Sequence, residues 1–183
     1  MRNFDIRKFA AVRDENNPAV RGVYHISGIT VATDGRILCA VNASYDESNE
    51  GKIIGKNGVI DAAFPKWRAV LLNDTMELYD VSLKRDPFEI LAGLSTKIKE
   101  AKKAKESGAV ASVMCNDKKL YIEGSLFLKF AGFLKKYPDV KIVAQIVAQH
   151  RDKWHAGIIQ AADEKGNICV VACNDIDCES FEC

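Results

Sequence analysis

The stretch VRGVYHISGITVATDGRILCAVNAS, residues 20–44, indicates the fold of this chain. Apolar and β-branched residues dominate it, and they are interrupted at Ser27-Gly28 and Asp34-Gly35, two dipeptides typical of tight turns. We therefore predict three antiparallel strands, at about 20–27, 29–33 and 37–45. The rest of the chain decides whether Asp34-Gly35 is only a turn or part of a functional motif.

Composition is that of an ordinary globular protein. The chain has 183 residues, of which 48% are hydrophobic and 28% charged, a length sufficient for one domain with a substantial core or for two small ones. No apolar run approaches the roughly 20 residues that span a bilayer. The N-terminal sequence lacks the apolar segment of a signal peptide. We therefore expect a cytoplasmic protein with no membrane partner.

Charge is nearly balanced, with 26 Lys and Arg against 25 Asp and Glu. The total charge therefore does not indicate a polyanionic partner. The distribution is less even, because residues 97–106 and 134–137 are rich in lysine whereas residues 174–183 are acidic. Runs of like charge usually form solvated surfaces, so they are weak evidence by themselves.

Sequence motifs of catalysis, metal binding and cofactor binding are not found. Cys39, Cys115, Cys169 and Cys173 fall in apolar, strand-like runs, and no Cys-x-x-Cys pair occurs, so we expect buried, reduced thiols. The histidines, at 25, 150 and 155, have no partner at a spacing typical of a metal site. We predict a protein that is not an enzyme and that needs no cofactor or metal.

Turn dipeptides, prolines and periodicity divide the rest of the chain into elements. Asn57-Gly58 predicts a hairpin over 51–61. Asp86-Pro87 followed by Glu89 predicts a helix from about 86 to 106. Two further helices are predicted at 4–13 and 125–137. The remaining predicted strands are at 75–83, 110–115, 119–123, 140–149, 154–163 and 167–174.

The two ends of the chain resemble each other. RKFAAV (7–12) is similar to LKFAGF (128–133), and NPAVRGVYHI (17–26) is similar to YPDVKIVAQI (137–146). Each end then continues into a strand that follows a glycine turn. The order at both ends is helix, proline and three antiparallel strands, which indicates an internal repeat.

The repeat predicts a single α+β domain over 1–183 with two pseudo-symmetric halves. In each half a helix packs its apolar face on an antiparallel sheet. The first half covers about 1–70 and the second about 110–183. A connecting strand and helix occupy about 71–109.

The motifs in both halves resemble the bacterial DNA sliding clamp family, the beta subunit of DNA polymerase III. The first half has the family's proline, the Gly-Val that follows it, and a Val-Ala-Thr-Asp-Gly turn. The matching motif residues are Pro18, Gly22, Ala32, Thr33, Asp34 and Gly35. In the second half, residues 120–147 resemble the clamp's strand, helix, Pro-Asp and strand unit, and residues 62–72 resemble the Phe-Pro segment that joins clamp domains.

This resemblance implies a DNA-clamp fold and a non-enzymatic role as a processivity factor in DNA replication. Clamps line a central hole with helices whose Lys and Arg contact phosphates without reading bases. The DNA-binding positions implied here are Arg7, Lys8, Lys129, Lys135 and Lys136. Duplex DNA is the implied partner. Further copies of the chain or other replication proteins are also implied, because one domain cannot close a ring.

Departures from the family leave an alternative open. Arg36 and Ile37 replace the His and Arg after the turn, Asn17 replaces the basic residue before the proline, and the chain has room for one domain where the family has three. The alternative is a protein–protein interaction module, or adaptor, that retains the clamp fold without DNA binding. Two simpler interpretations also stay open: the lysines are ordinary solvated side chains, and, without any clamp relationship, Asp34-Gly35 is only a hairpin turn.

Overall fold

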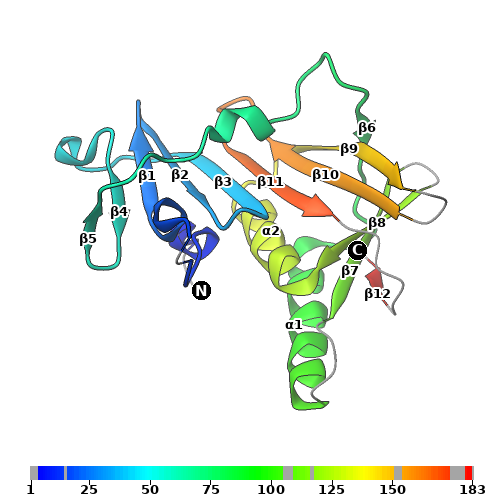
Figure 1. Ribbon diagram of the computed structural model, residues 1–183. Coiled ribbons are helices and arrows are strands. Elements are labelled where there is room, and N and C mark those ends of the chain that lie inside the picture. The colour runs from blue at the N-terminus through cyan, green and yellow to red at the C-terminus, as the bar shows by residue number, and fades with distance from the viewer. Residues whose placement is uncertain are drawn as a thin grey trace.

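The computed structural model describes residues 4–14, 16–104, 109–115, 118–150, 154–173 and 180–182. Within these ranges the chain has an α+β architecture, with one large antiparallel sheet, one three-stranded sheet and two α-helices (Figure 1). The predicted α+β class is therefore confirmed. Among the described residues, no helix is both long enough and apolar enough to cross a membrane.

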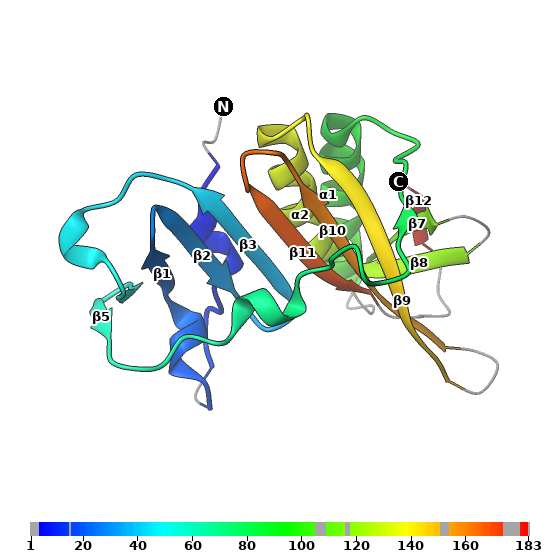
Figure 2. The same ribbon diagram turned by 90° about the horizontal axis from the view of Figure 1, so that it is seen from above.

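The large sheet combines strands from both ends of the chain. Its order is β5 (Gly58–Ile60), β4 (Ile53–Gly55), β1 (Val23–Ile26), β2 (Ile29–Thr33), β3 (Ile37–Asn42), β11 (Ile168–Cys173), β10 (Trp154–Ala162), β9 (Lys141–His150) and β6 (Tyr79–Asp80). In the centre, three consecutive strands from each end form a meander. The two meanders meet edge to edge where β3 pairs antiparallel with β11 (Figure 2).

The β3–β11 seam is the centre of a local pseudo-twofold arrangement. The β2–β3 ladder ends at Leu38, and the β10–β11 ladder ends at Ile168. The next residue in each strand is Cys39 in β3 and Cys169 in β11, so these two residues occupy equivalent positions. They are also paired directly with each other across the seam. Two equivalent residues that face each other must lie on the axis that relates their strands. The order β1-β2-β3-β11-β10-β9 has the same centre.

The two faces of the large sheet bury separate cores. On one face, β2, β3 and β11 pack with α2 (Gly124–Lys136) and with η1, a 3-10 turn at Ile6–Phe9. The largest fully buried side chains there are Phe127, Phe130 and Phe133. On the other face, Trp67 of the 3-10 turn η4 (Trp67–Val70) packs against Val31 and Val170. Figure 1 shows the helices below the sheet and the segment that contains η4 above it.

Elements outside the two meanders extend the fold at three places. The hairpin predicted over 51–61 is confirmed as β4–β5 and widens one end of the large sheet. At the other end, β6 pairs with β9. The helix α1 (Pro87–Ala104) packs beside α2, with Ile90 and Leu94 buried in the same core. The smaller sheet has the order β12 (Ser180–Glu182), β7 (Val110–Cys115) and β8 (Lys118–Glu123), and β8 leads directly into α2.

The helix predicted at 4–13 is only the four-residue turn η1. Asp5 caps η1, because its carboxylate accepts a hydrogen bond from the Arg7 N–H. The chain then extends, and the Ala11 N–H donates to the carbonyl of Val20 at 2.8 Å. This hydrogen bond ends the helix, and Phe9 remains buried in the core. The second-half helix is confirmed, at 124–136 where 125–137 was predicted.

Other boundaries differ for local reasons. The strand predicted at 20–27 begins at Val23, because Pro18–Arg21 forms the 3-10 turn η2. The strand predicted at 75–83 is reduced to β6 and a bridge between Val81 and Cys115. The strand β12 was not predicted. The last residues of the helix predicted at 86–106 lie outside the described ranges. The four cysteines expected to be buried thiols are confirmed as such.

Candidate functional site

The Asp34 turn is held by its own side chains. The Oδ1 atom of Asp34 accepts hydrogen bonds from the backbone N–H groups of Arg36 and Ile37, each at 3.0 Å. The Thr33 hydroxyl donates to the Ile37 carbonyl at 2.8 Å and accepts from the Gly35 N–H at 3.0 Å. Gly35 has a φ of 86°, which a residue with a Cβ rarely adopts. The hydrogen bonds of Thr33 and Asp34, together with the positive φ of Gly35, therefore account for the Thr-Asp-Gly motif as a tight turn.

The same turn also joins the two ends of the chain. The Oδ2 atom of Asp34 lies 2.7 Å from Nζ of Lys129 on α2, and the two side chains are only 11% and 24% exposed. Next to it, the Arg36 guanidinium forms an ion pair with Glu123, the residue before α2. Lys129 was predicted to contact DNA. In the structure its ammonium is paired with a carboxylate of the protein.

The turn between β10 and β11 has a similar carboxylate cap, formed by Asp163. Asp163 follows β10 as Asp34 follows β2, and its Oδ1 accepts from the backbone N–H groups of Lys165 and Asn167 at 3.0 and 2.8 Å. Its Oδ2 accepts from the Asn167 side-chain amide at 2.8 Å. Burial opposes the charged form of this carboxyl, but the hydrogen bonds from Asn167 and Lys165 lower the pKa of Asp163 overall. In both turns, therefore, an aspartate carboxylate caps two backbone N–H groups.

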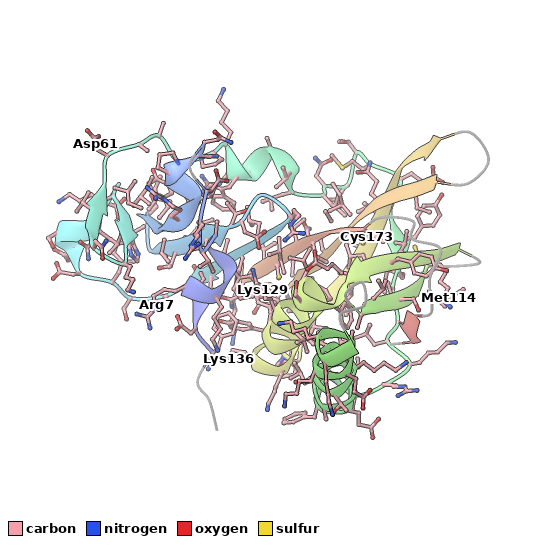
Figure 3. The ribbon with its side chains drawn as sticks, turned by 60° about the horizontal axis from the view of Figure 1, so that its bottom comes forward. Arg7, Asp61, Met114, Lys129, Lys136 and Cys173 are labelled. Carbon is pink, nitrogen blue, oxygen red and sulfur yellow. The ribbon has the colours of Figure 1, made fainter. Side chains whose placement is uncertain are left out.

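A groove with a volume of about 540 Å³ lies between η1, α1 and α2 on the helical side of the sheet. We call it the basic groove. Its apolar surface comes from Phe4, Phe9, Phe88, Leu91 and Leu128. Its charged residues are Asp5, Lys8, Lys129, Lys135 and Lys136. Four of the five predicted DNA-binding residues therefore line one groove, although they come from opposite ends of the chain. Figure 3 shows Arg7, Lys129 and Lys136 in this region, where η1 approaches α2.

The cations of this region differ in their surroundings. Arg7, the fifth predicted residue, forms a two-point ion pair with Asp5, with N···O distances of 2.9 and 3.1 Å. The hydrogen bond from Arg7 lowers the pKa of the Asp5 carboxyl. Lys8, Lys135 and Lys136 are exposed. The Lys135 ammonium lies 4.0 Å from the centre of the Phe88 ring, a cation–π contact between α2 and α1.

Additional lysines line the rest of α1. Lys97, Lys99, Lys102 and Lys103 are exposed, and they extend the basic character of the helical side beyond the groove. Lys105, which belongs to the same lysine-rich run, lies outside the described residues. The signal that could have identified the groove itself was weak, because Phe88 and Leu91 look like the apolar stripe of any amphipathic helix.

The histidine at 25 has a structural environment. Its Nδ1 lies 3.2 Å from the Thr30 hydroxyl, and its ring stacks at a tilt on Tyr45, 4.6 Å between centres. Burial lowers the pKa of His25, and the nearby Glu50 carboxylate partly offsets this. Glu50 in turn accepts hydrogen bonds from the Ser27 N–H and the Tyr45 hydroxyl. These contacts hold the segment after β3 against the β1–β2 turn.

Two observations concern metal-ligating and nucleophilic side chains in the part of the chain that the structure describes. No group of three His, Cys, Asp or Glu side chains there is arranged to hold a metal ion. Burial raises the pKa of the thiol of Cys169 well above its usual value, which disfavours the nucleophilic thiolate. The side chains of the histidines at 150 and 155 lie outside the described residues.

Comparisons of the chain with protein-family models, with curated proteins and with solved structures gave no match. The observations that bear on function are therefore the basic groove and the arrangement of the sheet.

Proposed function

We propose that this chain is a clamp-like, non-enzymatic protein that contacts the phosphate backbone of duplex DNA through the basic groove and acts in processive DNA replication. The observation that carries the proposal is the meeting of Lys8, from the first end of the chain, with Lys135 and Lys136, from the second. Cations gathered from distant segments favour a polyanionic ligand. Contacts to phosphates alone carry no sequence information, which suits a protein that slides.

The arrangement of the sheet supports a clamp fold within this proposal. Two three-stranded meanders joined at β3–β11 place η1 and α2 on the same face of one sheet. A twofold axis normal to a sheet has this effect, because it exchanges the two ends without exchanging the faces. A clamp requires helices toward DNA and sheets outside. Because η1 is a single turn, α1 and α2 supply most of the helical surface here.

Encircling DNA would require more than one such domain. We propose that copies of the chain, or partner proteins, associate head to tail to close a ring. The large sheet ends in the short strands β5 and β6, whose outer edges could extend the sheet between subunits. Light scattering of the purified chain, alone and with duplex DNA, measures its oligomeric state. A monomer under both conditions would exclude a ring made of copies of this chain.

Replacing three lysines together tests the DNA contact. In the triple variant Lys8→Gln, Lys135→Gln and Lys136→Gln, we expect affinity for a duplex to fall about tenfold or more at ~50 mM salt. The slope of log affinity against log salt should become less negative by about 3, because each lost phosphate contact removes about one released counterion. Fluorescence anisotropy of a labelled duplex at several salt concentrations measures both. Lys129 is left unchanged because its pairing with Asp34 supports the fold.

A matched control changes the same charge elsewhere. Lys52, Lys56 and Lys66 are exposed on the β4–β5 hairpin and on the segment before η4. Their triple Gln variant should keep the wild-type affinity and salt slope. Equal losses in the two triple variants would mean that only total charge matters, and the groove would not be the DNA site.

The adaptor alternative has one observation in its favour. Two of the five predicted cations, Arg7 and Lys129, are neutralised by Asp5 and Asp34 of the same chain. The same titration separates the two functions. If the wild-type chain shows no salt-dependent retention of duplex DNA, the proposal of DNA contact fails and the adaptor alternative takes its place.

A further inference from the structure

Phe88 is an aromatic side chain in an unusual position. It lies in the first turn of α1 and is 52% exposed, although the fold buries most of its other large apolar residues. Its ring borders the basic groove, and the Lys135 ammonium lies 4.0 Å from the ring centre. An exposed aromatic ring beside a cation offers a flat apolar surface to a ligand that also carries negative charge.

The surface around Phe88 is hollowed on two sides. Phe88 and Lys135 line the basic groove, and they also line a second depression of about 390 Å³ toward Pro138 and Ile142. The Phe88 ring therefore lines both depressions and separates them. The Lys135 ammonium lies over one face of the ring, so a flat group would stack on the opposite face of this 52% exposed side chain.

Charge selects an anionic occupant. Three lysines of the basic groove, Lys8, Lys135 and Lys136, are exposed, whereas the fourth, Lys129, is paired with Asp34. The carboxylate of the groove, from Asp5, is paired with Arg7. Beyond the groove, Lys99, Lys102 and Lys103 are exposed along α1. A short acidic peptide would need only the groove, whereas a basic track that continues along the helix suits a ligand with a regularly repeated charge. A nucleic-acid strand has one phosphate per nucleotide and a flat base on each.

We propose that the basic groove binds single-stranded nucleic acid, with one base stacked on Phe88 and the flanking phosphates held by Lys8, Lys135 and Lys136. This inference rests on the proposed function and deepens it. In a duplex the bases are stacked and paired, so a duplex can contact only the lysines at the rim. A single strand can place an unpaired base on the ring as well. A clamp-like protein with this site would favour DNA in which a strand is exposed next to a duplex.

The test compares Phe88→Leu with Phe88→Tyr. Leucine keeps apolar bulk and removes the aromatic ring, whereas tyrosine keeps the ring. The probes are a labelled oligothymidylate of about 12 nucleotides, within the usual size range of single-strand sites, and a duplex of equal length. We expect Phe88→Leu to weaken binding of the oligothymidylate by roughly 5- to 150-fold, the effect of losing one stacked base. Phe88→Tyr should bind it like the wild type.

Duplex binding and salt dependence identify the cause of any change. Phe88→Leu should weaken duplex binding far less than oligothymidylate binding and should keep both salt slopes close to those of the wild type, because Lys8, Lys135 and Lys136 all remain. Circular dichroism and the unfolding midpoint of each variant show that the fold is retained. If a variant is not folded, quenching of a 2-aminopurine base in the oligonucleotide by the wild-type chain provides the readout, and absence of quenching counts against stacking.

The outcomes separate this inference from the proposed function. If Phe88→Leu binds the oligothymidylate like the wild type while the triple lysine variant loses duplex binding, stacking is refuted and DNA contact stands. If the wild-type chain binds neither probe, both proposals fail. A synthetic peptide of alternating Glu and Leu serves as the competitor. If it binds more tightly than the oligothymidylate and loses affinity in Phe88→Leu, the groove is a peptide site and the inference is overturned.

Discussion

Phe133→Ala is expected to lower the free energy of unfolding by about 3–5 kcal/mol, the usual cost of deleting a buried phenyl ring. Phe133 is 0% exposed on α2. Its ring contacts Phe4, whose centre is 6.3 Å away, and Tyr137, at 4.8 Å. Phe4 precedes η1, so this aromatic cluster joins the first end of the chain to the helix of the second. The cavity would therefore weaken packing between the two ends. Urea unfolding followed by circular dichroism measures the loss.

Phe88→Ala is the matched control, because it makes the same substitution on the neighbouring helix. Phe88 is 52% exposed, so its removal leaves no enclosed cavity. We expect a cost of about 1 kcal/mol or less, in the range of surface substitutions. Similar costs at the two positions would mean that the interface between η1 and α2 is not a packed core. A second unfolding transition in Phe133→Ala would indicate that the two ends unfold separately.

Asp34→Ala is expected to lower the free energy of unfolding by about 2–4 kcal/mol. Two effects combine in this estimate. The Arg36 and Ile37 N–H groups lose their side-chain acceptor, a loss comparable to that of a helix N-cap at about 0.5–2 kcal/mol. In addition, the Lys129 ammonium, only 24% exposed, loses the carboxylate 2.7 Å away. Removing one partner of a fully buried pair costs about 3–5 kcal/mol, and partial exposure reduces this.

Two further variants separate these contributions. Asp163→Ala removes the turn cap of the β10–β11 hairpin together with the hydrogen bond from the Asn167 side-chain amide, and among the described residues Asp163 has no ion pair comparable to that of Asp34 with Lys129. It should therefore cost less, about 1–2 kcal/mol. Lys129→Met keeps the apolar stem and both turn caps, so its cost should also be smaller than that of Asp34→Ala. If Asp34→Ala and Asp163→Ala are equally destabilising in urea, the pair between Asp34 and Lys129 contributes nothing to stability.

Local elements were predictable because their signals lie within a few residues. Asn57-Gly58 and Asp34-Gly35 form the turns expected of them, and Asp86-Pro87 begins α1. The repeated order of elements also predicted that both ends contribute three consecutive strands. The errors lie where tertiary contacts compete with local preference. The 4–13 segment has a helical apolar pattern, but the hydrogen bond from Ala11 to Val20 ends the helix after one turn.

The candidate site was predictable only in part. The cations were named from the resemblance to the sliding clamp family, and four of the five meet in the basic groove. The side chains that form ion pairs with these cations could not be predicted from the sequence. Asp34 and Lys129 are 95 residues apart in the chain, and Arg36 and Glu123 are 87 apart. A single sequence carries no record of such pairs, because the attraction between two charges depends on a distance set by folding.

The sequence by itself determined the class of the protein: apolar alternation, turn dipeptides and amphipathic stripes act over a few residues and specify an α+β chain with two similar ends. Only the tertiary structure decided that β3 pairs with β11, that Asp34 neutralises Lys129, and that Phe88 stands exposed between two depressions. Edge pairing, ion pairing and exposure depend on which surfaces remain uncovered when the whole chain has packed.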